Sequence, residues 1–220
     1  MDIKRTAKFG WIYQESIHFD DKELLEKDKY NRYTLTRIKI WVGKKDERVV
    51  IQGIQTFFKD IQTGEEVTEG ERRDSQKPFT STHEFKLEVN EYIVDFHIRF
   101  ENEVTEIGFT TNKGRTEKWG GQTGEDKITH LTGAGKIVKG LFGSYTDVLG
   151  SCGALYIDKR DYLNSMFSGY FKLKYLLKKN EEIKKKCQSI PNLDEKGKTL
   201  VQACSLPDSI FNQIIKFCIY

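Results

Sequence analysis

The segment Glu103-Val-Thr-Glu-Ile-Gly-Phe-Thr-Thr-Asn-Lys-Gly-Arg-Thr116 decides the fold of this chain. Its apolar residues Val104, Ile107 and Phe109 stand among polar ones and predict a β-strand. Thr110 to Gly114 then forms a polar turn, in which Asn-Lys-Gly supplies the residue with positive φ that a tight turn requires. A strand that ends in such a turn predicts a hairpin, and therefore a β-sheet protein.

Three pairs of segments along the chain resemble one another, and each joins two alternating apolar stretches across a polar loop. The pairs are Arg37–Val42 with Ile51–Phe57, Tyr92–Ile98 with Val104–Thr110, and Lys136–Phe142 with Leu149–Leu155. One hairpin cannot bury both of its faces, but three related hairpins, each widened by connecting strands, can enclose a common core. The repeats therefore predict a β architecture with pseudo-threefold symmetry.

These motifs resemble those of the jacalin-related lectins. In that family a strand ending in FxTNKGR leads into a Gly-Gly loop, found here at Trp119-Gly-Gly-Gln-Thr-Gly124, and then into GKIVGFxGRSGxxLDxIG, found here from Lys136 onward. Phe19-Asp20-Asp21 also matches the end of the family's first-strand pattern, WGGxGGxxFDD. The resemblance implies a mainly β fold over residues 5–157, namely a β-prism I of three Greek-key antiparallel sheets.

Residues 158–220 lie outside the resemblance and predict a helical, basic C-terminal extension. Between Lys159 and Ile190 there are nine basic and three acidic residues, and apolar residues recur at three- and four-residue spacing, as in an amphipathic helix. Ser205-Leu-Pro-Asp208 has the pattern of a helix N-terminus. The helix after it is too apolar to stay in water and too short to cross a bilayer. We expect it to dock on a protein partner through Ile210, Phe211, Ile214, Ile215 and Phe217.

The composition is that of a soluble protein, since 37% of the 220 residues are hydrophobic and 31% are charged. No apolar run approaches the length of a membrane span, and the start of the sequence lacks the apolar region of a secretion signal. These features predict an intracellular, cytoplasmic protein, with association to the cytoskeleton or an organelle left open. The four cysteines are expected to be reduced thiols, because no metal-binding spacing links them. They are Cys152, Cys187, Cys204 and Cys218.

The resemblance also implies where a sugar would bind. In the family, a glycine-rich first loop and a Gly-x-x-x-Asp loop between the last two strands hold the sugar, and the carboxylate accepts hydrogen bonds from two adjacent hydroxyls. By sequence position the glycine pair of the first loop falls on Glu15 and Ser16. In the last loop the glycine falls on Thr146 and the carboxylate on Gly150, while Asp147 lies three residues before Gly150. Gly121 is either a ligand contact or part of a structural turn. The loop positions of this degenerate sugar site are Glu15, Ser16, Gly121, Thr146, Asp147 and Gly150.

Catalytic, cofactor and metal sites are not indicated. The four histidines form no close-spaced pair, and the sequence contains no GxSxG or Walker motif. The lysines of the extension are interleaved with glutamates and accompany no nucleic-acid motif. We therefore expect no enzymatic activity, no cofactor, no metal and no nucleic-acid partner.

Two functions remain, and the missing glycines and carboxylate favour the first. In the first, the domain is a non-enzymatic, lectin-like module for protein interaction, anchored in a larger intracellular assembly by its C-terminal helices. In the second, it is a cytoplasmic carbohydrate-binding lectin of mannose type, with altered binding loops around Asp147 and Gly121.

Overall fold

The computed structural model describes residues 2–26, 32–60, 63–122 and 135–161. All of its strands belong to one compact unit, Met1–Lys159. The expected C-terminal helices, with Ile210 and its apolar neighbours, lie outside the described residues. The division of the chain into residues 5–157 and 158–220 stays a prediction.

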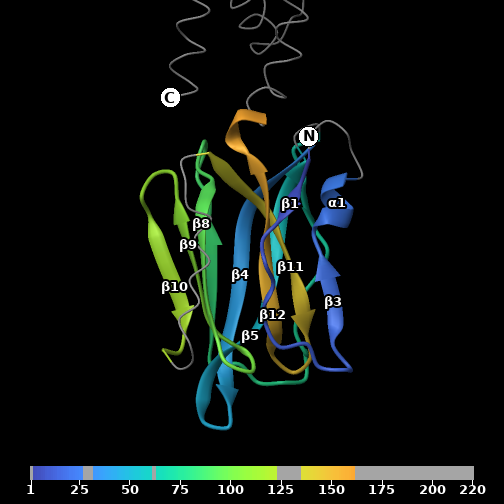
Figure 1. Cartoon of the computed structure of the whole chain (residues 1–220), viewed down its shortest axis with the longest axis vertical. Helices are drawn as coiled ribbons and strands as arrows, with labels where there is room; N and C mark the ends of the chain where they lie inside the picture. The colour runs from blue at the N-terminus through green and yellow to red at the C-terminus, as the bar shows by residue number, and fades with distance from the viewer. Residues whose placement is uncertain (1, 27–31, 61–62, 123–134, 162–220) are drawn as a thin grey trace, which may run out of the picture. The chain divides into compact units, whose positions relative to one another are not determined.

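The described residues form three antiparallel sheets around a common interior (Figure 1). The first sheet has the order β1 (Lys4–Arg5), β12 (Leu149–Asp158), β11 (Lys136–Tyr145), β3 (Ile17–Asp20), and β2 (Phe9–Gly10) also pairs with β12. The second has the order β6 (Glu66–Thr68), β5 (Arg48–Asp60), β4 (Tyr33–Lys45), β7 (Ser81–Lys86). The third has the order β10 (Thr116–Gly120), β9 (Val104–Thr111), β8 (Ile93–Phe100). One short helix, α1 (Lys22–Glu26), follows β3.

One long hairpin lies at the centre of each sheet, and these hairpins are the three repeats predicted from the sequence. β4 pairs with β5, β8 with β9, and β11 with β12, all antiparallel. The apolar residues of each hairpin face the interior, as pairs such as Ile40 opposite Ile54 and Ile98 opposite Ile107 show. The predicted mainly β, prism-like fold is confirmed.

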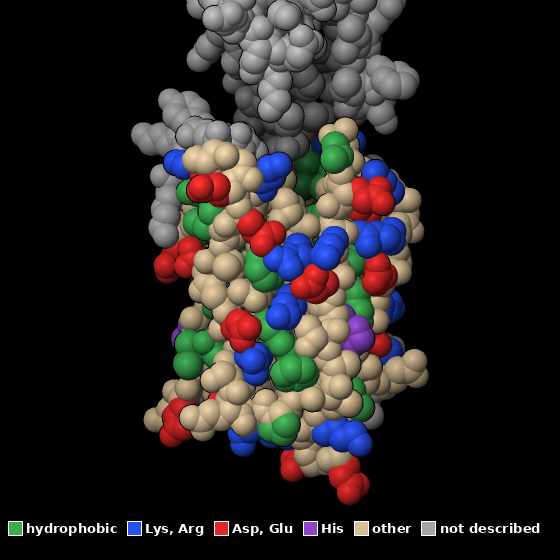
Figure 2. Space-filling view, turned by 180° about the vertical axis from the view of Figure 1, so that it is seen from behind, with side chains coloured by type: hydrophobic (Ala, Val, Ile, Leu, Met, Phe, Trp, Pro, Cys, Tyr) green, Lys and Arg blue, Asp and Glu red, His purple; other side chains and the backbone are tan. Residues whose placement is uncertain are grey.

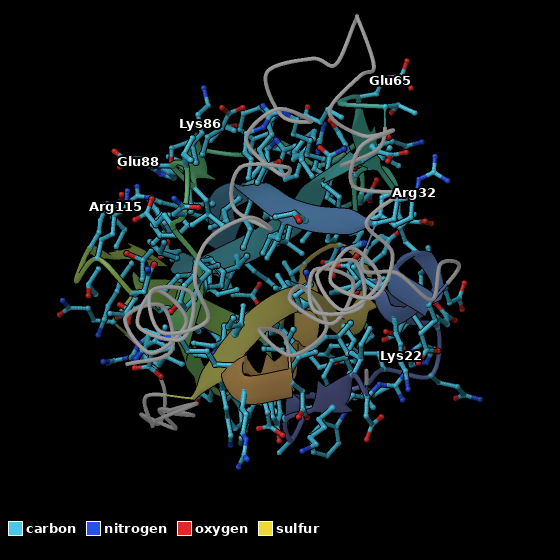
Figure 3. The ribbon with its side chains drawn as sticks, turned by 90° about the horizontal axis from the view of Figure 1, so that it is seen from above. Lys22, Arg32, Glu65, Lys86, Glu88 and Arg115 are labelled. Carbon is cyan, nitrogen blue, oxygen red and sulfur yellow. The ribbon has the colours of Figure 1, made fainter. Side chains whose placement is uncertain are left out.

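The core joins the sheets through aromatic contacts. The ring of Phe109 on β9 lies 5.5 Å from that of Phe85 on β7 and 5.7 Å from that of Phe96 on β8. All three side chains are buried, so the edge of the second sheet packs against the centre of the third. Viewed along the strands, the three sheets enclose this interior, with charged residues such as Lys22, Arg32 and Glu65 around the rim (Figure 3).

Two glycines show the pseudo-threefold symmetry in atomic detail. Gly10 has a φ of 103° and Gly120 a φ of 117°, and each is the last residue of a strand that pairs with a central hairpin. A Cβ at Gly10 would lie 2.1 Å from the carbonyl oxygen of Gly150, and one at Gly120 would lie 2.0 Å from that of Thr105. Gly150 and Thr105 are the positions that the repeats make equivalent, so the internal alignment holds in space.

Two segments with mostly polar sequences contribute residues to the interior. Leu24 and Leu25 of α1 are buried, although the helix is otherwise charged. In the loop 69–78, the guanidinium of Arg72 is buried and pairs with Asp21. These residues are buried by contacts with segments distant in sequence, which the polar local sequence does not indicate.

The face of the molecule opposite to the view of Figure 1 is polar and mixed in charge. Figure 2 shows basic side chains interspersed with acidic ones and only small hydrophobic patches between them. Arg37 on β4 exemplifies the pattern, since it forms ion pairs with Glu84 on the neighbouring strand β7 and with Glu66 on β6, two strands away. Within the described ranges, no helix is long and apolar enough to cross a membrane.

Candidate functional site

The hairpin tips bring the candidate site together. Because β4–β5 and β11–β12 run in the same sense along the prism, their tips meet at one end, the lower end in Figure 1. The tip of β4–β5 consists of Asp46 and Glu47, whose φ values of 50° and 65° are those of a tight two-residue hairpin turn. The tip of β11–β12 is the short connection 146–148.

A cavity of about 460 Å³ lies at this end. Three residues come from the loop between β2 and β3, two from the tip of β11–β12, and one from the end of β4. They are Tyr13, Gln14, Glu15, Thr146, Asp147 and Lys45. The cavity is thus assembled from segments far apart in sequence, and it contains both signs of charge, hydroxyl groups and one aromatic ring. A concave surface with a few convergent polar groups is the usual form of a small-ligand site.

The loop between β2 and β3 is fixed by local hydrogen bonds. The amide of Tyr13 donates to Ser16 Oγ at 3.0 Å, and the amide of Ser16 donates to the carbonyl of Tyr13 at 3.0 Å. The amide of Trp11 donates to the carbonyl of Gly150 at 2.9 Å, which ties the loop to β12. Ser16 therefore closes a turn that holds Glu15 at the cavity.

Asp147 presents a carboxylate at the cavity. Thr146 Oγ1 donates to Asp147 Oδ1 at 2.9 Å, and Lys45 Nζ lies 3.8 Å from the same oxygen. The side chain of Asp147 is 37% exposed, and its Oδ2 accepts no hydrogen bond from the described part of the chain. One oxygen is held by the protein while the other is open to a ligand.

A buried carboxylate lies beneath the cavity. Glu103, in the tip 101–103 between β8 and β9, has a side chain only 3% exposed, and its Oε1 lies 2.8 Å from Lys45 Nζ. Tyr13 donates its hydroxyl to the same oxygen at 3.1 Å. Burial lowers the pKa of Lys45, but the hydrogen bond to Glu103 and the nearby Asp147 outweigh it and raise that pKa. Burial and the hydrogen bond to Glu103 raise the pKa of Tyr13. Lys45 is thus charged and Tyr13 neutral over the physiological range.

The structure brings some of the sequence-predicted site residues together and separates others. Glu15, Thr146 and Asp147 line the cavity, and Ser16 closes the adjacent turn. Gly150 lies inside β12, where its carbonyl accepts from Trp11. Gly121 does not line the cavity: its amide donates to Thr105, and a Cβ there would lie 2.7 Å from the carbonyl oxygen of Val49.

Four contributors were not predicted from the sequence, namely Tyr13, Gln14, Lys45 and Glu103. Lys45 and Glu103 belong to the other two hairpins, so no short-range motif links them to the loop that holds Asp147. The one signal that points to them is the threefold repeat, because equivalent hairpins must end at the same end of the prism.

Other reactive groups of the described residues do not form a second site. Cys152 is a free, buried thiol, and burial raises its pKa to about 12. His97 and Glu106 are buried on neighbouring strands and pair with each other. No group of three or more histidine, cysteine or acidic residues in the described ranges is arranged to hold a metal ion.

A comparison with protein families matches this chain to the Jacalin-like lectin domain over residues 16–155. The chain belongs to that family. The match covers the β4–β5 and β8–β9 hairpins, most of the β11–β12 hairpin and its tip 146–148, and it begins just after the cavity-lining residues 13–15. A comparison with curated proteins gives no match. Carbohydrate binding, and not catalysis, is the activity of the jacalin-like lectins.

Solved structures of jacalin-like lectins share the fold. The Calystegia sepium agglutinin is 15% identical with a TM-score of 0.57, and the match covers 72% of this chain and 99% of that one. The Malaysian banana lectin is 16% identical with a TM-score of 0.55, covering 72% of this chain and 100% of the lectin. A mannose-binding jacalin-related lectin from Ananas comosus is 15% identical with a TM-score of 0.53, covering 71% of this chain and 98% of the other. At these identities the similarity shows the fold alone.

Proposed function

We propose that this jacalin-like domain binds carbohydrate in the cavity between the β2–β3 loop and the β11–β12 tip. The observation that carries the proposal is the position of Asp147, which lines the cavity together with Glu15. Although the carboxylate is displaced along the sequence, the short tip 146–148 places it opposite the first loop. These two loops are the ones that the family uses for sugar.

The chemistry of the cavity suits a pyranose ring. The open oxygen of Asp147 accepts a hydrogen bond from a sugar hydroxyl, and a carboxylate is a stronger acceptor than a neutral oxygen. The ring of Tyr13 offers an apolar surface for the C–H groups of the sugar. Glu15 replaces a family glycine, so the first loop contributes a side chain in addition to backbone amides.

A glycan array with the purified protein tests this proposal, with a mannose-specific jacalin-related lectin as the positive control. We expect specific binding that falls at least tenfold in Asp147→Asn, since a hydrogen bond to a charged group contributes about 1.5 to 3 kcal/mol. Asp46→Asn is the matched control, because Asp46 is exposed at the neighbouring tip and asparagine tolerates its positive φ. Absence of specific binding, or equal binding by both variants, would overturn the proposal.

A protein-interaction module is the second candidate, and exposed apolar residues favour it. Trp11, Ile12 and Ile17, which flank the first loop, are 60%, 46% and 57% exposed. The anchoring of such a module by residues 205–220 in a cytoplasmic assembly stays a prediction. If deletion of residues 205–220 leaves the protein soluble and still assembled with its partners, that anchoring role is wrong.

A further inference from the structure

We propose that Lys45 is a ligand-contacting residue of the cavity and that Glu103 is its positioning residue, so that this pair determines which charge of sugar the cavity accepts. The inference rests on the proposed carbohydrate binding. It adds a contribution from the second and third sheets to a site that the two loops of the first sheet otherwise form.

Lys45 stands in the wall of the cavity between two carboxylates. Its Nζ lies 2.8 Å from Glu103 Oε1 and 3.8 Å from Asp147 Oδ1. The second distance is too long for a hydrogen bond. An ammonium group carries three N–H donors, and Glu103 takes one of them. Lys45 and Asp147 line the same cavity, so adjacent sugar hydroxyls can meet a donor from Lys45 and an acceptor from Asp147.

Glu103 is built to hold this ammonium group. A buried carboxylate is costly unless charged partners and hydrogen bonds compensate it. Its Oε1 accepts hydrogen bonds from Lys45 and from the hydroxyl of Tyr13. Its Oε2 accepts none from the residues that the structure describes and lies 3.7 Å from Arg48. The ammonium of Lys45 also lies 5.3 Å from the centre of the Tyr13 ring. Carboxylate and ring together restrict the position of Lys45.

The charges around the cavity add up to a negative sum. The lining contributes Glu15 and Asp147 against Lys45, which gives 1 − 2 = −1. Glu103 beneath it makes the sum −2, because Arg48 is shared with the exposed Glu101 at 2.8 Å. The charge of Lys45 is therefore already neutralised, and a carboxylate on the ligand meets repulsion. A neutral sugar, which accepts a hydrogen bond from Lys45 without adding charge, is compatible with this negative sum.

Titration calorimetry with four probes tests the inference: the methyl glycosides of mannose and galactose, and the two methyl uronosides oxidised at C6. For native protein we expect each neutral probe that binds to bind about tenfold more tightly than its uronoside. Lys45→Met is expected to weaken binding of that neutral probe about tenfold. Lys44→Met is the matched control, since Lys44 is exposed and does not line the cavity. Failure of native protein to bind any of the four probes would overturn the proposed function and this inference together.

Glu103→Gln separates positioning from a merely structural role. Removal of its charge is expected to raise the uronoside affinity relative to the neutral probe about tenfold, whereas loss of folding would weaken both. The double variant Lys45→Met, Glu103→Gln removes both charges of this pair, so neither is left buried without its partner. It provides a second test if Glu103→Gln alone is unstable. In that background we expect Glu103→Gln to leave the affinity for the neutral probe unchanged. The inference would be overturned if Lys45→Met left the affinity for the neutral probe unchanged. It would also be overturned if Glu103→Gln left the ratio of the uronoside affinity to the neutral-probe affinity unchanged. In both cases the proposed function would stand.

Discussion

The carboxylate of Asp21 and the guanidinium of Arg72 form an ion pair in the interior of the prism, where both side chains are buried. Thr56 Oγ1 on β5 donates to Asp21 Oδ1 at 3.0 Å, and the amide of Leu141 on β11 donates to its Oδ2 at 2.8 Å. Arg72 also contacts Thr56 at 3.1 Å. One polar cluster therefore ties the start of α1 and the loop 69–78 to the first and second sheets.

Loss of Arg72 should destabilise the fold strongly. Arg72→Met leaves the carboxylate of Asp21 buried without its charge partner, which typically costs 3 to 5 kcal/mol, so we expect a decrease of about 4 kcal/mol in the free energy of unfolding. Urea denaturation measures it. Arg37→Met is the control, because the ion pairs of Arg37 with Glu66 and Glu84 are exposed and should contribute less than about 1 kcal/mol. Equal losses in the two variants would contradict the structural role of the cluster.

Gly120 is expected to tolerate no side chain. Its φ is 117°, and an added Cβ would lie 2.0 Å from the carbonyl oxygen of Thr105, which belongs to a central strand. We expect Gly120→Ala to lower the free energy of unfolding by about 3 kcal/mol. At Gly114, φ is also positive but the space is open, so Gly114→Ala should cost only about 1 kcal/mol. Thermal denaturation of both variants measures the two losses. Gly114→Ala reports the conformational cost alone, and Gly120→Ala reports the conformational cost together with the steric cost.

The sequence predicts the parts of this molecule that depend on local rules. Alternating apolar residues and the positive φ of Gly114 reflect the backbone and its immediate neighbours, so the strands and the Asn-Lys-Gly turn could be predicted. The burial of Arg72 and the position of Lys45 depend on packing between hairpins, which no short motif encodes. Asp147 lies between these cases. The sequence predicted that Asp147 lies in the loop between the last two strands. Whether it lines the cavity depends on the length of the tip, which the sequence did not predict.

Lys139 should make the free energy of unfolding depend on pH in the alkaline range. Burial on β11 lowers its pKa to about 8, whereas the unfolded chain keeps the ordinary value near 10.5. The unfolded state therefore binds more protons between these values, and the free energy of unfolding should rise as pH increases from about 8 to 10.5. Lys139→Met removes this dependence. It should be about 2 kcal/mol more stable at pH 7, because relief of desolvation exceeds the loss of the polar contacts of Lys139, among them the hydrogen bond to the carbonyl of Tyr33.

Urea denaturation of both proteins from pH 7 to 10 checks this prediction, since other titrating groups cancel in the difference. The stability of Lys139→Met should exceed that of the native protein at pH 7, and the gap should narrow above pH 8. A variant that is less stable at pH 7, with a gap independent of pH, would show that the amine of Lys139 is well solvated in the folded protein.

Glu91 should make the free energy of unfolding depend on pH in the acidic range. Burial raises its pKa, but the hydrogen bonds from Arg115, the amide of Glu88 and Thr111 outweigh burial and lower that pKa to about 2. Figure 3 shows Arg115 and Glu88 on the same side of the prism. The unfolded value is 4.5, so the stabilisation is complete above about pH 4.5 and is lost as pH falls toward 2.

Glu91→Gln tests this dependence against a matched control. At pH 7 the variant should be about 2 kcal/mol less stable than native protein, a figure reduced because Arg115 is 35% exposed and its charge is partly screened. Near pH 2 the two proteins should approach equal stability. Glu88→Gln should follow the native curve throughout, because the side chain of Glu88 is 74% exposed and its ion pair is with Lys113, whose side chain is 42% exposed. A constant difference between Glu91→Gln and native protein from pH 2 to 7 would mean that Glu91 contributes through packing and not through its charge.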